Sequence, residues 1–293
     1  MARYEYRLVD VFTNERFAGN PLAVFPSADG INATDMQRIA NEFNLSETTF
    51  VLSTDHPECD CQVRIFTPHL EMPMAGHPTI GTAWVLDRGA RVTFLEGVGP
   101  ITVERRSTSA GAVQWWMSQP LPTWGARVEH RENAAALLGL EPSDLDADLP
   151  AEVVSTGAPF LFVALRTRDA LARARLRVDQ WEPLSAALKA HGVFCFTRDT
   201  GDAAVTVRSR MFAPEAGVIE DPATGSASGP LGCHLIRYGA IRAASPTRML
   251  SLQGVEMGRP SHVHIEIEGG PDAFTAVQVG GECVAVGGGY LEI

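Results

Sequence analysis

Three residues of types that transfer protons stand out in the chain: Glu47, His77 and Asp221. Two carboxyl groups and an imidazole can take up and return protons near neutral pH once their surroundings adjust their pKa values. His77 and Asp221 each precede a proline, in Gly76-His77-Pro78 and Glu220-Asp221-Pro222. Proline is favoured at the first position of a helix, because an N–H there would have no partner in any case. We therefore predict that His77 and Asp221 occupy the N-cap positions of two helices.

The backbone N–H groups just beyond such caps point out of the helix end, where the helix dipole favours negative charge. Two helix ends facing one cleft would hold a carboxylate and a developing enolate-like charge without metal or cofactor. Glycine at 81 and 225 would let backbone or ligand approach closely. The simpler structural alternatives stay open: Asp221 as an ordinary helix cap, His77 as a structural histidine and Glu47 as an exposed corner carboxylate.

An internal repeat predicts how these residues are brought together. Arg64–Pro68 (RIFTP) resembles Arg210–Pro214 (RMFAP), and His77–Ala83 can be aligned with Asp221–Ala227. Both matches lie at strand-to-helix junctions and occur in the same order, which makes chance similarity the weaker explanation. We predict a duplicated protein with a pseudo-two-fold axis, in which the two loops face each other.

Glu47 lies at a predicted corner between a helix and a strand. The preceding helix can end at Asn44 in a left-handed conformation, and Thr48–Leu52 is a β-branched and aromatic run that favours a strand. Leu45 and Phe50 make the surroundings of Glu47 partly apolar. Such surroundings raise the pKa of a carboxyl group and suit it to move protons near neutral pH.

The length of 293 residues fits two domains of roughly 150 residues each. A proline-rich break at Gln119–Pro122 is the best linker candidate. The predicted N-terminal lobe is 1–120 and the predicted C-terminal lobe is 121–280. The sequence leaves open whether the last strand, about 281–293, completes the first lobe.

Composition narrows the function classes. A net charge of −11 repels nucleic-acid backbones, so no nucleic-acid partner is expected. No segment approaches the ~20 apolar residues of a membrane span, and the charged N-terminus does not suit a signal peptide. Five cysteines, an odd and scattered number, indicate a reducing compartment, and we expect a cytoplasmic protein.

No metal or nucleotide motif is convincing. His262 and His264 share a strand face but have no third ligand at suitable spacing, so they are taken as surface histidines. Cys59-Asp60-Cys61 is too tight for a zinc knuckle. Gly287-Gly288-Gly289 is no dinucleotide loop, because no helix can follow it. We expect neither metal nor cofactor.

Five segments resemble a known family, the PhzF-like phenazine-biosynthesis proteins of the diaminopimelate-epimerase fold. They spread over most of the chain, in the order Asp10–Thr13, Phe17–Val24, Asn44–Phe50, Gly76–Gly81 and Glu220–Ala227. The resemblance implies an α+β protein with two pseudo-symmetric lobes, each a β-barrel-like sheet around a central helix. It also implies an active site between the lobes, and a homodimer.

The resemblance further implies roles for individual residues. The residue matching Glu47 is the general acid/base that isomerises trans-2,3-dihydro-3-hydroxyanthranilate, converting the diene to an enol that becomes a ketone. Those matching His77 and Asp221 bind the substrate and assist the transfer, without a cofactor. Together with the close approach expected at one glycine, the predicted substrate-binding residues are Ser46, Gly76, Gly225 and Ser226.

Diaminopimelate epimerases and proline racemases of this fold carry a cysteine in each half where this chain has His77 and Asp221. Without these cysteines the two-thiol racemase mechanism is excluded. The hypothesis is therefore a cofactor-independent isomerase of a small carboxylic acid. The alternatives are an epimerase, racemase or dehydratase on another hydroxy- or amino-acid, or a non-catalytic metabolite-binding protein.

Overall fold

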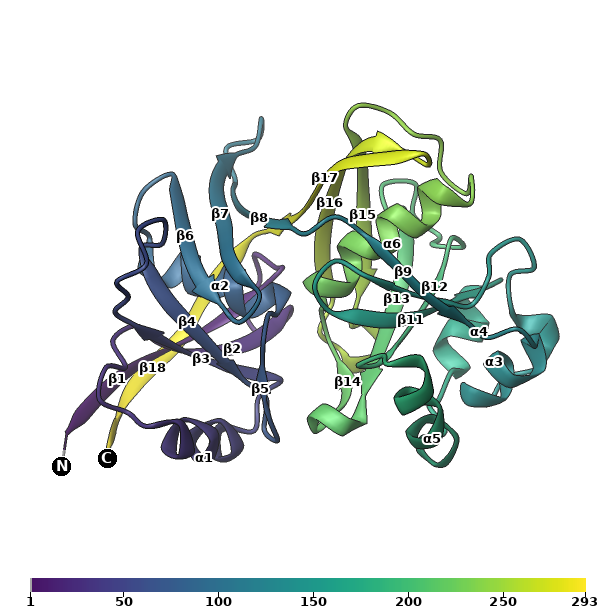
Figure 1. The fold of residues 1–293 in the computed structure, drawn as a ribbon. Coiled ribbons are helices and arrows are strands. Elements are labelled where there is room, and N and C mark those ends of the chain that lie inside the picture. The colour runs from purple at the N-terminus through teal and green to yellow at the C-terminus, as the bar shows by residue number, and fades with distance from the viewer. Residues whose placement is uncertain (1) are drawn as a thin grey trace.

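The computed structural model describes residues 2–293 and shows two lobes side by side (Figure 1). One lobe is built largely from the first half of the chain. Its elements are β1 (Arg3–Val11), β2 (Asn20–Phe25), α1 (Ala33–Phe43), β3 (Glu47–Leu52), β4 (Cys61–Phe66), β5 (Glu71–Met72), α2 (Gly76–Leu86), β6 (Arg91–Glu96), β7 (Gly99–Ser107) and β8 (Val113–Gln119).

The second lobe follows after three residues that include Pro120 and Pro122. Its helices are α3 (Arg131–Leu137), α4 (Arg168–Arg173), α5 (Val178–Leu188) and α6 (Gly225–Arg237). The strands after β8 are β9 (Thr123–Arg127), β10 (Glu152–Ser155), β11 (Pro159–Leu165), β12 (Val193–Thr197), β13 (Val207–Ala213), β14 (Val218–Asp221), β15 (Thr247–Gln253), β16 (Ser261–Gly270), β17 (Ala273–Gly281) and β18 (Cys283–Glu292).

Each lobe wraps strands around one buried helix. In α2 the first eight residues, Gly76–Ala83, are all buried, and in α6 the buried stretch is Gly225–Ile236. Glycine, alanine, serine and threonine dominate the first turns of both helices, so strands can approach on every side. A helix covered all round belongs to a core rather than to a surface. The predicted α+β fold, with a sheet around a central helix in each lobe, is confirmed.

The lobes are linked by the return of the chain to the first lobe and by one strand pairing. β18 runs antiparallel to β1, with Arg3 opposite Glu292, so the end of the chain returns to the first lobe. β8, whose label lies at the crossing between the lobes in Figure 1, pairs with β17. We keep 1–120 with about 281–293, and 121–280, as a proposed division. Within residues 2–293, no helix is both long enough and apolar enough to span a membrane.

The predicted helix starts are wrong for both loops. α2 begins at Gly76 with Ala75 as its N-cap, so His77 already lies inside the first turn. Asp221 is the last residue of β14, and the N-cap of α6 is Thr224. Proline is tolerated throughout a first turn, because none of its first N–H groups has a partner in the helix. An X-Pro pair therefore located the helices but not their first residues.

The first match of the repeat, Arg64–Pro68 with Arg210–Pro214, is confirmed. In the second match the predicted alignment of His77–Ala83 with Asp221–Ala227 differs from the one that the structure gives. Arg64 on β4 and Arg210 on β13 each pair with a glutamate on the short strand that follows, Glu71 and Glu220. The helix starts, however, equate Gly76 with Gly225. The side-chain bonds agree with this: the hydroxyls of Thr79 and Ser228 both donate to the carbonyl of the N-cap residue, four positions earlier.

Candidate active site

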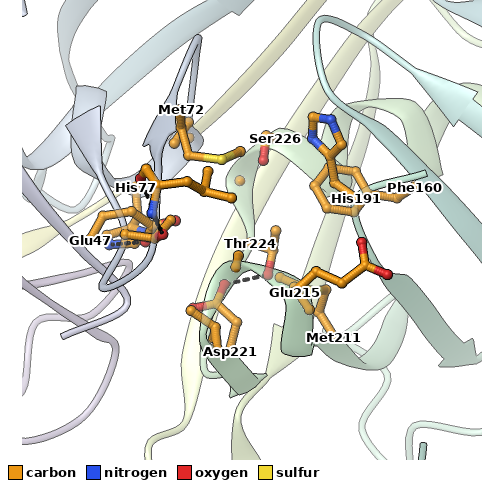
Figure 2. Close-up of a pocket in the computed structure, with 18 of the residues that line it drawn as sticks. Glu47, Met72, His77, Phe160, His191, Met211, Glu215, Asp221, Thr224 and Ser226 are labelled. Carbon is orange, nitrogen blue, oxygen red and sulfur yellow. Dashed lines mark hydrogen bonds and ion pairs between the residues drawn. The ribbon is translucent and has the colours of Figure 1, made fainter. Parts of the chain in front are cut away.

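A cavity of about 250 Å³ lies between the lobes and is lined by residues from both. Figure 2 shows Glu47, Met72 and His77 on one side and Asp221, Thr224 and Glu215 on the other. The apolar part of the wall comes from side chains such as Met72, Phe160 and Met211. A small organic acid with an apolar body fits such a lining.

Strand pairing places Glu47 at the polar end of this cavity. β2 begins at Asn20 and β3 at Glu47, and the two strands run parallel with Leu22 opposite Glu47. The same end of the sheet therefore carries both polar side chains. The side chain of Glu47 is only 15% exposed, and its Oε2 lies 3.4 Å from Nε2 of His77. The predicted helix-to-strand corner is confirmed, with Asn44 in the left-handed region at φ 50°.

Asn20 links His77 to Asp221. Its Nδ2 lies 3.0 Å from Nδ1 of His77 and donates to Oδ1 of Asp221 at 2.7 Å and to the carbonyl of Ala223 at 2.9 Å. An ionised Asp221 carboxylate and the carbonyl of Ala223 can only accept hydrogen bonds. Nδ2 of Asn20, and not its Oδ1, must therefore face these two oxygens. Nδ1 of His77 then faces an NH₂ group and is the unprotonated ring nitrogen. The proton of His77 consequently resides on Nε2, which lies 3.4 Å from Oε2 of Glu47.

Asp221 is surrounded by donors. Besides Asn20 at Oδ1, the hydroxyl of Thr224 donates to Oδ2 at 2.5 Å. Burial raises the pKa of Asp221 to about 6, although the hydrogen bonds from Thr224, Ser46 and Asn20 lower it. Near pH 7 Asp221 is accordingly an anion.

The surroundings of Glu47 and His77 both favour the neutral forms of these side chains. Burial, and then the charge of Asp221, raise the pKa of Glu47 well above its ordinary value. Burial lowers the pKa of His77 to about 3. Within the described chain, Oε2 of Glu47 and Nε2 of His77 are buried without a hydrogen-bond partner. Unpaired buried polar atoms are costly, which indicates that a bound molecule would complete their hydrogen bonding.

The two buried helices meet at the cavity with their N-termini. Neither N-cap residue, Ala75 or Thr224, makes a side-chain hydrogen bond to its helix. The first residues of the helices, Gly76 and Gly225, line the cavity together with Ser226. Their amide groups and the two helix dipoles can therefore attract a carboxylate at the polar end.

The structure brings six of the seven predicted site residues to the cavity, and Ser46 is the exception. Glu47, His77, Asp221, Gly76, Gly225 and Ser226 all line the cavity. Ser46 is not among the lining residues, and its hydroxyl lowers the pKa of the Asp221 carboxyl. Gly81 packs against Val11 and Leu22 and touches core side chains, not the cavity.

Sequence reasoning missed Asn20 and Gln253 as supporting residues. Asn20 follows a glycine and precedes a proline, which reads as a turn, and nothing local shows that its side chain is buried. Gln253 ends β15 and reaches Asp221 only through the tertiary fold. A buried amide beside a proton-transfer group is a signal that appears only in three dimensions.

The three proton-transfer residues also form a cluster that could bind a metal. In residues 2–293, Glu47, His77 and Asp221 are the group whose ligand atoms all lie within 4.8 Å of one another. Two carboxylates and one imidazole suit several divalent metals. Both oxygens of Asp221 already accept hydrogen bonds, however, and Nδ1 of His77 faces Asn20. This arrangement favours proton transfer, and the expectation that no metal or cofactor takes part stays a prediction.

The comparisons with known proteins agree with one another. Residues 9–289 match the PhzC-PhzF family model, described as phenazine biosynthesis-like protein. The chain is 41% identical to trans-2,3-dihydro-3-hydroxyanthranilate isomerase of Pseudomonas chlororaphis, over 98% of this chain and 99% of that protein. The fold superposes on a PhzF-family phenazine biosynthesis protein of Bacillus anthracis with a TM-score of 0.91, 28% identity and 100% of both chains covered.

A hydroxyproline epimerase from Agrobacterium vitis shares the fold alone, with a TM-score of 0.67 and 10% identity over 99% of this chain and 92% of that one. Of the described residues that line the cavity, none is a cysteine, as the exclusion of a two-thiol mechanism requires. From its full-length match to isomerases and to the family model, the chain belongs to the PhzC-PhzF phenazine biosynthesis-like family and is an isomerase.

Proposed function

We propose that the protein isomerises a small carboxylic acid similar to trans-2,3-dihydro-3-hydroxyanthranilate, with Glu47 as the proton-transfer group. One observation carries the proposal: a buried Glu47 with an unpaired oxygen faces the cavity where two uncapped helix N-termini meet. The helix amides would hold the carboxylate of the substrate, and Glu47 would face its ring.

The chemistry needs one proton delivered and one removed. Glu47, in the protonated form that its raised pKa favours, gives its proton to one carbon of the diene. The resulting carboxylate then removes a proton from another carbon, which yields the enol and regenerates neutral Glu47. His77, through Nε2–H, and Asp221, through its negative charge, stabilise the charges that develop between the two steps. No external co-reactant is required.

Deuterium incorporation tests this order of steps. In heavy water Glu47 carries deuterium before the substrate binds, so each product molecule should acquire one deuterium at the protonated carbon. Glu47→Gln, which cannot give up a proton, should lower kcat by ~10²–10⁴-fold while the variant still binds the substrate. Turnover by Glu47→Gln at the parent rate would show that another group moves the proton.

Two further features belong to the proposal. We propose a homodimer and a cytoplasmic location, as the family resemblance and the five free cysteines suggest. Light scattering at several protein concentrations would test the dimer. A monomer with full activity would contradict it.

A further inference from the structure

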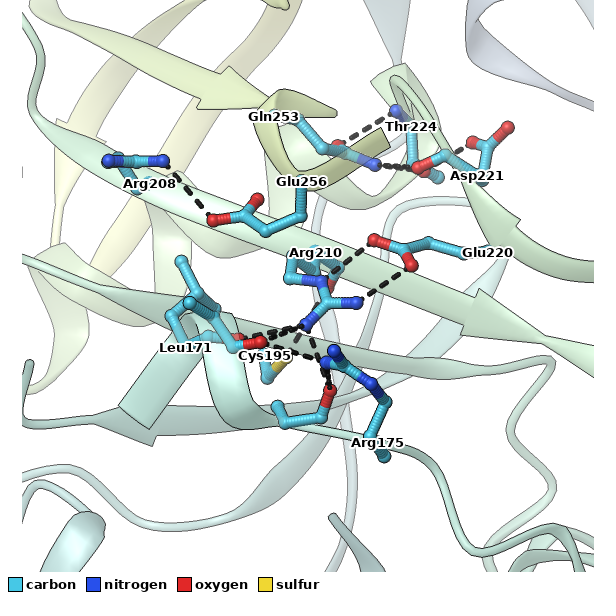
Figure 3. Close-up of polar contacts among 12 residues, drawn as sticks. Leu171, Arg175, Cys195, Arg208, Arg210, Glu220, Asp221, Thr224, Gln253 and Glu256 are labelled. Atoms are coloured by element: carbon cyan, nitrogen blue, oxygen red, sulfur yellow. Dashed lines mark hydrogen bonds and ion pairs between the residues drawn. The ribbon is translucent and has the colours of Figure 1, made fainter. Parts of the chain in front are cut away.

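Gln253 lies at the end of β15, beneath the segment that carries Asp221. The side chain is fully buried. The next residue, Gly254, has φ 75°, and a β-carbon there would lie 2.6 Å from the carbonyl oxygen of Pro222. The strand end therefore presses directly against the 221–224 segment, as Figure 3 shows for Gln253, Thr224 and Asp221.

The amide orientation of Gln253 is determined by its partners. Its Oε1 accepts from the backbone N–H of Thr224 at 3.0 Å, and its Nε2 donates to the backbone carbonyl of Asp221 at 2.8 Å. A backbone N–H can only donate and a carbonyl can only accept, so the amide cannot be turned over. The remaining hydrogen of Nε2 is directed at the hydroxyl oxygen of Thr224, 3.0 Å away.

This contact determines where the hydroxyl hydrogen of Thr224 points. Because Thr224 Oγ1 accepts from Gln253, its single hydrogen is left for Oδ2 of Asp221, at 2.5 Å. A hydroxyl that must donate stabilises the ionised form of a carboxyl group. Oδ1 of Asp221 accepts from Asn20, so donors reach both oxygens of this carboxylate.

Glu47 has no comparable set of donors. Its Oε2 is buried without a hydrogen-bond partner in the described chain and lies 3.4 Å from Nε2 of His77. A carboxylate oxygen of Glu47 and one of Asp221 lie within 4.8 Å of each other. Two carboxyl groups this close tend to share one proton, and the group with fewer donors keeps it.

We propose that Gln253, acting through the Thr224 hydroxyl, is a positioning residue that keeps Asp221 ionised and leaves the shared proton on Glu47. The inference rests on the proposed function, because it explains why Glu47 rather than Asp221 begins the cycle as the acid. The titratable and charged groups facing Asp221 are Glu47 from β3, His77 from α2 and Glu220 on β14 itself, which pairs with Arg210 of β13.

Two substitutions at Thr224 separate this role from a merely structural one. Thr224→Val removes the hydroxyl but leaves both backbone bonds made by Gln253, so the 221–224 segment keeps its anchor. Thr224→Ser restores the hydroxyl. Ser251→Ala is the matched control. Ser251 shares β15 with Gln253, and the change removes a buried hydroxyl bond to Ser209 of β13, away from Asp221. Gln253→Met removes the group that orients the hydroxyl.

The Asp221 carboxyl can be titrated by ¹³C NMR in the free protein, with Asp221→Asn providing the assignment. Loss of a hydrogen bond to a charged group should raise the pKa of Asp221 by about one unit or more in Thr224→Val. Gln253→Met should shift it in the same direction, and Thr224→Ser and Ser251→Ala should match the parent. The acid limb of kcat/KM should move with the NMR value.

An unchanged Asp221 titration in Thr224→Val would overturn the inference, and so would a Glu47 that loses its proton before Asp221. If Gln253→Met does not fold, the Thr224 pair decides alone. The NMR titration needs no substrate. A parent enzyme that fails to convert trans-2,3-dihydro-3-hydroxyanthranilate would therefore count against the proposed function, not against the proton assignment.

Discussion

Gly76 and Gly225 lie backbone to backbone: a β-carbon added to Gly76 would be 2.6 Å from Cα of Gly225. These glycines are the first residues of α2 and α6, and they come from different lobes. Their contact lets both helix N-termini open on one cavity. Any side chain at either position would separate the two ends.

Gly76→Ala should therefore impair both folding and catalysis. The methyl group overpacks a buried contact, which costs about 1–3 kcal/mol of unfolding free energy. It also displaces the helix amides from the substrate, so kcat/KM should fall on the order of 10²-fold. Urea unfolding and steady-state kinetics measure the two effects. Gly287→Ala, where an added β-carbon meets nothing within 4 Å, is the control. Equal behaviour of the two variants would contradict the tight contact.

Asn20→Leu should release the histidine that faces Glu47. The substitution removes the NH₂ group that holds Nδ1 of His77 unprotonated, and it removes a donor from Asp221. We expect kcat/KM to fall at least tenfold and the pKa of Asp221 to rise. ¹⁵N NMR of labelled histidine should show the Nε2–H tautomer of His77 in the parent. An Nδ1–H tautomer there would refute the assignment.

Glu96 is expected to be a neutral carboxylic acid. The hydroxyl of Thr79 lies 2.6 Å from the carbonyl of Ala75 and 2.5 Å from Oε1 of Glu96. One hydroxyl hydrogen cannot serve two acceptors, so Glu96 must supply the second. Burial raises the pKa of Glu96 from 4.5 to about 8.

This raised pKa makes stability fall with rising pH. Between pH 4.5 and about 8 the folded protein holds a proton on Glu96 that the unfolded chain releases. The stabilisation is complete below this window and lost as pH rises through it, on the order of a few kcal/mol. Glu96→Gln keeps a donor to Thr79 without titrating, so its unfolding free energy relative to the parent should rise from pH 5 to pH 8.

Urea unfolding at several pH values measures that difference. Glu47 and Asp221 titrate in both proteins, so their contributions cancel in the comparison. Thr79→Val serves as the control, because it removes the hydroxyl and leaves Glu96 able to titrate. If the difference in unfolding free energy between the parent and Glu96→Gln stays constant from pH 5 to pH 8, Glu96 is not a neutral carboxylic acid in the folded protein.

The arginine–glutamate pair occurs once in each lobe, and removing the arginine should lower the unfolding free energy by very different amounts in the two places. Arg210 is 4% exposed, donates to both oxygens of Glu220 at 2.8 Å and also donates to the carbonyls of Leu171 and Ala174, as Figure 3 shows in part. Its counterpart Arg64 is 23% exposed, and its partner Glu71 is 43% exposed.

Arg210→Met should destabilise the fold by about 3–5 kcal/mol, because Glu220 and the carbonyls lose their partner in a buried place. Arg64→Met should cost less than about 1 kcal/mol, since water can solvate Glu71. Thermal unfolding of both variants under one condition makes the comparison. Similar losses of stability in the two variants would mean that burial does not determine how much the arginine–glutamate pair contributes.

The fold and family could be assigned from the sequence because they depend on short motifs whose structure is determined by neighbouring residues. Asn44 ends a helix in the left-handed region, Glu47 begins a strand, and the X-Pro pairs mark two helix entries. The exact first residues of α2 and α6 could not be predicted, because a proline fits any position of a first turn.

The sequence by itself determined which residues can move protons, Glu47, His77 and Asp221, and that two similar halves would present them. The tertiary structure alone decided how they are protonated. Asn20 reaches His77 and Asp221 from 57 and 201 residues away, and Gln253 reaches Thr224 from a different strand. The physical reason is that protonation depends on burial and on the number of donors around each carboxyl group, and strand pairing and lobe contact create both.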